Sequence, residues 1–162
     1  MKTLKKRRRQ NKTDYLKRLK LLKSKSPRIV FRKTNKYIIA QYTTSKQAQD
    51  RIEIGINSKN LINYGWPKES KGSLKSLSAS YLIGLLMGKK ILDKKLETPI
   101  VDLGMIRALH KTKVYAFMKG LNDAGIEIKC TEEAFPNEDR IKGEHMKNKI
   151  PFDEIKSKIK NE

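Results

Sequence analysis

The sequence is poor in cysteine and in long apolar runs. Cys130 is the only cysteine among 162 residues, so no internal disulfide can form, as is usual in a reducing compartment. The longest apolar stretch, residues 81–88, is far shorter than the roughly 18–20 residues that cross a bilayer. No apolar segment follows the basic start of the chain, so we expect no secretory signal and no membrane anchor.

Motifs that carry catalysis or bind cofactors are also scarce. His110 and His145 lie in unrelated contexts, and no second His or Cys stands at metal-ligand spacing. Gly-rich phosphate loops are missing, so we expect no metal, cofactor, small-molecule substrate or catalytic residue. One enzymatic alternative stays open: Asp102 could serve a metal-dependent nuclease if a second carboxylate, such as Glu53 or Glu97, joined it.

Positive charge is concentrated at the start of the chain. Residues 1–36 carry 16 of the 38 Lys and Arg side chains against one acidic residue, Asp14, a net charge of +15; the other 126 residues carry a net +6. Like charges packed together repel each other and oppose folding. Such a segment needs an anionic partner, and the commonest one is a nucleic-acid backbone.

The basic start also offers suitable contacts to RNA. Residues 5–9 (KKRRR) contain a block of guanidinium groups, which bind phosphate oxygens bidentately. The polar residues 10–13 (QNKT) can reach sugars or bases, and Tyr15 could stack on a base or join the apolar stripe of a helix. A solvated face or a localisation signal is a weaker interpretation, because the basic residues continue into the segment 28–36. A membrane-surface helix is also weaker, since residues 13–23 contain neither Trp nor Phe.

Residues 13–23 are expected to form a short amphipathic helix, with Thr13 as its N-cap and a narrow leucine stripe opposite a broad basic face. Two β-branched and aromatic runs, 28–32 and 37–43, predict a hairpin whose turn uses Asn35 with positive φ. The alternating run 50–57 predicts a third strand with Ile52, Ile54 and Ile56 on its buried face.

A central helix follows and then two β-strand signals separated by a helix. The apolar pattern predicts a helix over 74–92 capped by Ser73, in which Gly84 and Gly88 permit close approach to the sheet. Short apolar runs predict strands at 99–104 and 126–129, on either side of a helix over 113–124 that Gly125 ends. The order β-β-β-α-β-α-β predicts an α/β fold, a mixed sheet carrying helices.

Composition divides the chain into three parts. Residues 1–26 are expected to be a basic RNA-binding arm with its short helix, and residues 27–130 an α/β core domain. Residues 131–162 alternate in charge with sparse apolar residues, so we expect a charged helical tail whose one or two helices need an outside surface to pack on.

The arm and several later segments resemble a known family. Residues 7–15 (RRRQNKTDY), 35–41 (NKYIIAQ), 79–86 (ASYLIGLL) and 139–146 (DRIKGEHM) are similar, in this order, to segments of the large-subunit ribosomal protein eighteen family in its archaeal and eukaryotic form. The length of the chain is closer to that of the archaeal members. The resemblance implies a sheet like that of ribonuclease H, a cytoplasmic place in the ribosome, and no enzymatic activity.

The resemblance also implies partners: 5S rRNA, the large-subunit rRNA of the central protuberance, and neighbouring proteins including ribosomal protein five. Family contacts to 5S rRNA carry over to ten positions: Arg7, Arg8, Arg9, Lys12, Thr13, Tyr15, Arg28, Arg32, Asn35 and Lys36. Lys17, Arg18 and Lys33 are added on charge alone. A regulatory RNA or DNA binder outside the ribosome is the remaining non-enzymatic alternative.

Overall fold

Three consecutive strands form the centre of the computed structural model, which describes residues 3–146 and 149–161. Strands β1 (Arg28–Lys33), β2 (Ile38–Lys46) and β3 (Gln49–Asn57) pair in antiparallel order, and β4 (Ile100–Asp102) runs parallel to β1. The sheet order is β3-β2-β1-β4. The expected mixed α/β architecture is confirmed, with four strands in the described part of the chain.

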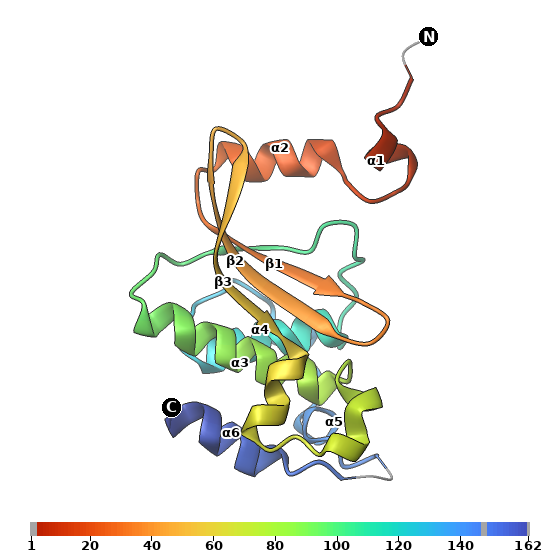
Figure 1. Ribbon diagram of the computed structural model, residues 1–162, viewed down its shortest axis with the longest axis vertical. Helices are drawn as coiled ribbons and strands as arrows, with labels where there is room; N and C mark the ends of the chain where they lie inside the picture. Colours follow the sequence, from red (N-terminus) through yellow and green to blue (C-terminus); the bar gives the residue numbers. More distant parts are fainter. Residues whose placement is uncertain (1–2, 147–148, 162) are drawn as a thin grey trace.

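Helices α3 (Leu77–Asp93) and α4 (Lys113–Asp123) cover one face of the sheet (Figure 1). Strand side chains alternate in direction, so Ile29 and Phe31 of β1 point into the core and are fully buried. The ring of Phe31 lies 4.9 Å from that of Phe117 in α4. The opposite face of β1 carries Arg28 and Arg32, and this face is turned toward the N-terminal helices.

Glycines bring α3 and α4 into close contact. A Cβ atom added at Gly84 would meet the carbonyl oxygen of Phe117, and one added at Gly120 would meet that of Tyr81. A Cβ at Gly88 would collide with the side chain of Ala124. The close approach expected for Gly84 and Gly88 is therefore to a neighbouring helix, and the sheet was the wrong partner.

The C-terminal helices pack on the chain itself. Helix α5 (Glu138–Lys142) contacts α3, and α6 (Phe152–Asn161) contacts both α3 and the 3-10 helix η1 (Ser58–Tyr64). Phe152, Ile155 and Ile159 of α6 are buried in the common core. Two further 3-10 helices, η2 (Lys68–Ser73) and η3 (Glu132–Ala134), complete the helical elements of the described residues. The surface on which the C-terminal tail packs is therefore the α/β core of the same chain.

The strand expected at residues 126–129 does not form. The N–H of Ile126 donates to the carbonyl of Leu121 (3.0 Å), while Gly125 takes a φ of +100° and ends α4 as expected. Ile128 then bonds to the side chain of Asn122 through its N–H (3.0 Å) and its carbonyl (3.4 Å). Because the end of α4 satisfies these backbone groups, they are not available to a sheet.

Three local expectations were also wrong. Ser76, and not Ser73, caps α3, since its hydroxyl accepts from the N–H of Ala79 (3.2 Å). The β1–β2 turn is closed by Thr34, whose hydroxyl accepts from the N–H of Tyr37 (2.9 Å), and Asn35 does not take positive φ. Ile52 is 52% exposed, and the pairing of β2 with β3 shifts register between Ile54, which is buried, and Ile52.

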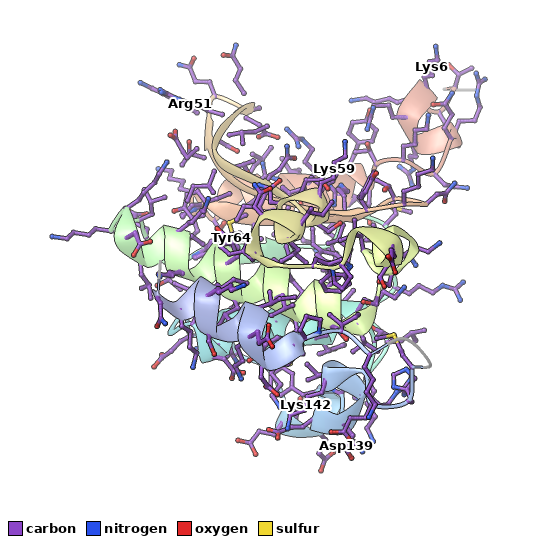
Figure 2. The ribbon with its side chains drawn as sticks, turned by 60° about the horizontal axis from the view of Figure 1, so that its bottom comes forward. Lys6, Arg51, Lys59, Tyr64, Asp139 and Lys142 are labelled. Carbon is purple, nitrogen blue, oxygen red and sulfur yellow. The ribbon has the colours of Figure 1, made fainter. Side chains whose placement is uncertain are left out.

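The N-terminal helices α1 (Lys6–Arg9) and α2 (Tyr15–Lys23) lie on the side of the sheet away from α3 (Figure 1). Lys6 of α1 and Asp139 of α5 stand at opposite ends of the molecule (Figure 2).

Among the described residues, none of the helices combines the length and the apolar character that a membrane crossing requires.

Candidate nucleic-acid interface

The arm folds back on itself before α2 begins. Asp14 is the N-cap of α2: one oxygen of its carboxylate accepts from the N–H groups of Leu16 (3.0 Å) and Lys17 (3.1 Å). Thr13, expected to be the cap, instead accepts from Nε of Arg7 (2.9 Å). This bond turns α1 toward α2 and leaves the terminal nitrogens of Arg7 with no hydrogen-bond partner in the described part of the chain.

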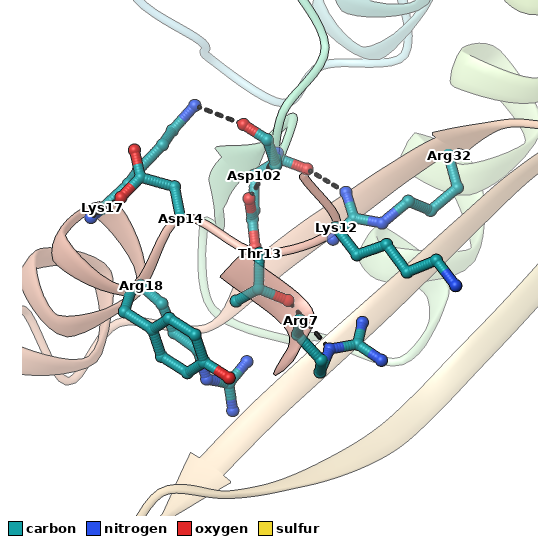
Figure 3. Close-up of a pocket in the computed structure, with 10 residues that line it drawn as sticks. Arg7, Lys12, Thr13, Asp14, Lys17, Arg18, Arg32 and Asp102 are labelled. Atoms are coloured by element: carbon teal, nitrogen blue, oxygen red, sulfur yellow. Dashed lines mark hydrogen bonds between the residues drawn. The ribbon is translucent and has the colours of Figure 1, made fainter. Parts of the chain in front are cut away.

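Five cationic side chains line one hollow of about 360 Å³ between the arm and β1 (Figure 3). Four of them come from the arm, in α1, in α2 and between these helices, and the fifth comes from β1: Arg7, Lys12, Lys17, Arg18 and Arg32. The acidic side chains beside them, Asp14 and Asp102, are already occupied by backbone N–H groups. These hydrogen bonds do not remove the charge of the two carboxylates, but five cations outnumber them, so the lining of the hollow has a net positive charge.

The predicted contact residues around this hollow are mostly accessible. Arg8, Arg9, Lys12, Arg32, Lys33, Asn35 and Lys36 are exposed, and Tyr15, Lys17 and Arg18 are half-buried. Nζ of Lys5 lies 4.7 Å from the ring centroid of Tyr15, a distance typical of a cation–π contact. Arg32 stays near the sheet through a bond from one guanidinium nitrogen to the carbonyl of Phe31 (3.0 Å).

Arg28 does not belong to this accessible set. It is 1% exposed, and its guanidinium contacts the carboxylates of Asp102 (3.2 Å) and Asp50 (2.7 Å) and the hydroxyl of Ser45 (2.9 Å). Its place among the RNA contacts is corrected here, because the side chain is buried and its guanidinium is held by Asp50, Asp102 and Ser45. The sequence placed it on an open strand face, because its partners Asp50 and Asp102 lie 22 and 74 residues later in the chain.

Asp102 has a structural role. One oxygen accepts from the N–H of Gly104 (2.8 Å) and the other pairs with Arg28. Glu53 and Glu97, its suggested partners, act elsewhere: together with burial, which is the larger effect, their charges raise the pKa of Tyr42. In the described residues, no three His, Cys, Asp or Glu side chains could together hold a metal ion.

Two further lysines extend the positive surface beyond the residues expected from sequence. Burial lowers the pKa of Lys113, at the start of α4, and the charges of Lys33 and Lys75 lower it further. Lys33 and Lys75 therefore each lie close enough to Lys113 to repel its charge. Nothing in the sequence signals this group, because its members are far apart along the chain. Lys33 ends β1, Lys75 lies just before α3, and Lys113 is the first residue of α4.

Comparison with known proteins identifies the family. A family model described as "Ribosomal large subunit proteins 60S L5, and 50S L18" matches residues 1–99. The chain belongs to this family. It is 43% identical over 140 residues to the large ribosomal subunit protein uL18 of Korarchaeum cryptofilum, which covers 86% of this chain and 70% of that relative. It is 39% identical over 140 residues to the uL18 of Methanoregula boonei, covering 86% and 78%.

The resemblance noted in the sequence is thus confirmed. Members of this family are structural proteins, so the chain is a non-enzymatic constituent of the large ribosomal subunit. This subunit is a ribonucleoprotein of the cytoplasmic translation machinery. The absence of enzymatic activity in this family agrees with the contacts of Asp102. One oxygen of its carboxylate accepts from Gly104 and the other pairs with Arg28. The nuclease interpretation is therefore set aside.

Proposed function

We propose that this ribosomal protein binds 5S rRNA and helps attach it to the large-subunit rRNA in the central protuberance, beside ribosomal protein five. The observation that carries the proposal is the hollow between arm and sheet, where cations from α1, α2 and β1 meet around one space. A phosphate backbone entering it would touch three elements at once. RNA duplexes are recognised largely through such shape and phosphate contacts.

We further propose a division of work among the three parts of the chain. Residues 1–26 neutralise phosphate charge, residues 27–130 supply the shaped surface, and residues 131–162 support that surface from behind through the burial of α6. The sheet order, a three-stranded meander with β4 parallel to β1, supports the proposed likeness to the ribonuclease H fold.

Within this proposal the RNA contacts are Arg7, Arg8, Arg9, Lys12, Thr13, Tyr15, Lys17, Arg18, Arg32, Lys33, Asn35 and Lys36, with Lys75 and Lys113 added and Arg28 removed. Arginine forks in α1 bind phosphates bidentately. The exposed lysines Lys33 and Lys36, at the end of β1 and in the turn after it, supply further point charges.

The direct test is binding of the full chain to isolated 5S rRNA, with a tRNA of similar length as competitor, at about physiological salt. We expect a clear preference for 5S rRNA. Equal binding to both RNAs would overturn the proposal and leave the arm as a general polycation. Co-sedimentation with large subunits separates a ribosomal role from that of a free regulatory binder.

A further inference from the structure

Helix α2 is attached to the rest of the protein mainly by polar contacts. None of its nine residues is buried, and Leu16 and Leu19 are 64% and 52% exposed. A helix this short is not stable alone in water and gains most of its stability from what it packs on. The contacts that hold α2 therefore decide where the basic arm points.

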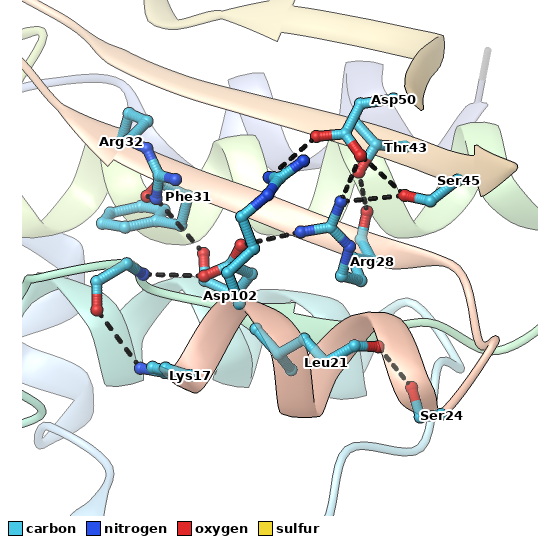
Figure 4. A network of polar contacts seen from close by, with 12 residues as sticks. Lys17, Leu21, Ser24, Arg28, Phe31, Arg32, Thr43, Ser45, Asp50 and Asp102 are labelled. Atoms are coloured by element: carbon cyan, nitrogen blue, oxygen red, sulfur yellow. Dashed lines mark hydrogen bonds and ion pairs between the residues drawn. The ribbon is translucent and has the colours of Figure 1, made fainter. Parts of the chain in front are cut away.

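Arg28 is the centre of these contacts (Figure 4). Its guanidinium lies between the carboxylate of Asp50, at the start of β3, and that of Asp102, at the end of β4. The hydroxyl of Ser45 bonds both to Arg28 and to Asp50 (2.9 and 2.7 Å). A buried arginine with this many partners has a fixed position, so both carboxylates are held in place.

Each of the two carboxylates is connected to α2 by hydrogen bonds, that of Asp50 directly and that of Asp102 through Gly104. The second oxygen of Asp50 accepts from Arg18 (3.0 Å). On the other side, Asp102 holds the N–H of Gly104, whose carbonyl accepts from Nζ of Lys17 (3.3 Å). Adjacent residues of a helix lie about 100° apart around its axis, so these two anchors fix the rotation of α2 as well as its position.

We propose that Asp50 is a positioning residue for RNA binding, which holds α2 and the arm in a preformed orientation without touching RNA itself. This inference rests on the proposed function. Preorganisation reduces the ordering that must accompany binding, and here it keeps Arg7, Lys12 and Arg32 around one hollow. Burial alone would raise the pKa of Asp50, but Ser45, Arg18 and Arg28 outweigh it and lower that pKa, so the carboxylate is charged near neutral pH.

The proposal and simple electrostatics predict opposite changes in RNA affinity when Asp50 is replaced. Replacing Asp50 by Asn removes a negative charge from a basic surface, and charge alone would then strengthen RNA binding. Loss of positioning would weaken it. Glu53→Gln is the matched control, because it removes the same charge from the same strand at a residue bonded to Thr44 and paired with Arg51 and not with α2.

Two measurements on the full chain test the inference. The first is backbone hydrogen exchange in the free protein: with Asp50→Asn, the amides of α2 should exchange about tenfold faster or more, and those of α3 should not change. Arg18→Gln breaks the same contact from the helix side and should give the same result. Unchanged exchange of α2 in both variants would overturn the inference.

The second measurement is affinity for 5S rRNA. We expect Asp50→Asn to weaken binding about threefold to tenfold, and Glu53→Gln to leave it unchanged or slightly stronger. Equal affinity of the two variants, or tighter binding by Asp50→Asn, would overturn the positioning role. A wild-type chain that does not prefer 5S rRNA over tRNA overturns the proposed function instead, and the exchange comparison then decides whether Asp50 anchors α2.

Discussion

Arg28 carries a full charge in the interior, where an unpaired ion is very costly. Its two carboxylate partners compensate this cost, so removing the cation leaves two acidic groups facing each other beneath α2. A buried pair of this kind adds little net stability compared with apolar residues, but breaking one side of it is strongly destabilising.

We therefore expect Arg28→Met to lower the free energy of unfolding by about 3 kcal/mol, measured by urea denaturation. Asp50 is partly open to water, which keeps the expected loss near the lower end of the range for broken buried pairs. Arg51→Met is the control, since the side chain of Arg51 is 83% exposed and surface pairs contribute about 0–1 kcal/mol. Similar losses in the two variants would contradict the role of Arg28.

Asp50 should make stability depend on pH. Its pKa in the folded protein is lower than its ordinary value of 3.8, so the unfolded chain binds the proton more readily and acid favours unfolding. The contribution of Asp50 is complete above that ordinary value and is lost as pH falls through the lower folded value.

The measurement is the difference in unfolding free energy between the wild type and Asp50→Asn, from about pH 6 to pH 2. We expect a constant difference down to roughly pH 5 and a shrinking one below it. A difference that stays constant down to the acid end would mean that the carboxylate charge contributes nothing to the fold.

At the scale of elements, the α3–α4 contact depends on glycine. Gly84 and Gly120 let the two backbones approach so closely that each missing Cβ would strike a carbonyl of the other helix. We expect Gly84→Ala to cost about 1–3 kcal/mol or more through overpacking, seen as a lower melting temperature.

Gly72→Ala is the matched control for this substitution. A Cβ at Gly72 meets no atom within 4 Å, so this variant should change stability by less than about 1 kcal/mol. If Gly84→Ala melts like Gly72→Ala, the two helices can separate without loss and their contact does not define the fold.

Elements with one dominant local signal could be predicted from the sequence. The β1–β2 hairpin, the third strand and α4 with its Gly125 stop follow from side-chain periodicity and turn chemistry, and the structure confirms them. The segment 126–129 has the composition of a strand, but its hydrogen bonds are taken by Leu121 and Asn122 of the preceding helix. Composition does not reveal that competition.

The interface was predictable in charge but not in geometry. The charge of the arm is visible in the sequence, and seven of the thirteen predicted contact residues line the observed hollow. The exclusion of Arg28 accompanies its burial and its ion pairs with Asp50 and Asp102. Such long-range pairs leave no local pattern, so a buried and an exposed arginine look alike in the sequence.

At the scale of the whole molecule, the arm and the α/β domain should be separable. Residues 1–12 contain seven of the 38 Lys and Arg residues, and no residue of α1 is buried. Deleting them should leave the melting temperature unchanged. It should reduce the slope of log affinity against log salt by up to about 6, since each neutralised phosphate contributes about 0.9.

The measurement is 5S rRNA affinity between about 50 and 200 mM salt, where a chain that makes 6–10 phosphate contacts loses roughly 10³–10⁵ in affinity. An unchanged slope after deletion would show that the arm neutralises no phosphates. A lower melting temperature would show instead that α1 supports the fold.

The anchoring of α2 has a consequence for the order of events during synthesis. Asp102 lies 74 residues after Arg28, and Gly104 lies 87 residues after Lys17. A growing chain thus makes its most cationic segment before the residues that anchor it: Asp50 follows Arg18 by 32 residues, and Gly104 follows much later. Until the segment after β4 has been made, α2 can have only the anchor at Asp50, and the contact from Lys17 to the carbonyl of Gly104 completes its attachment.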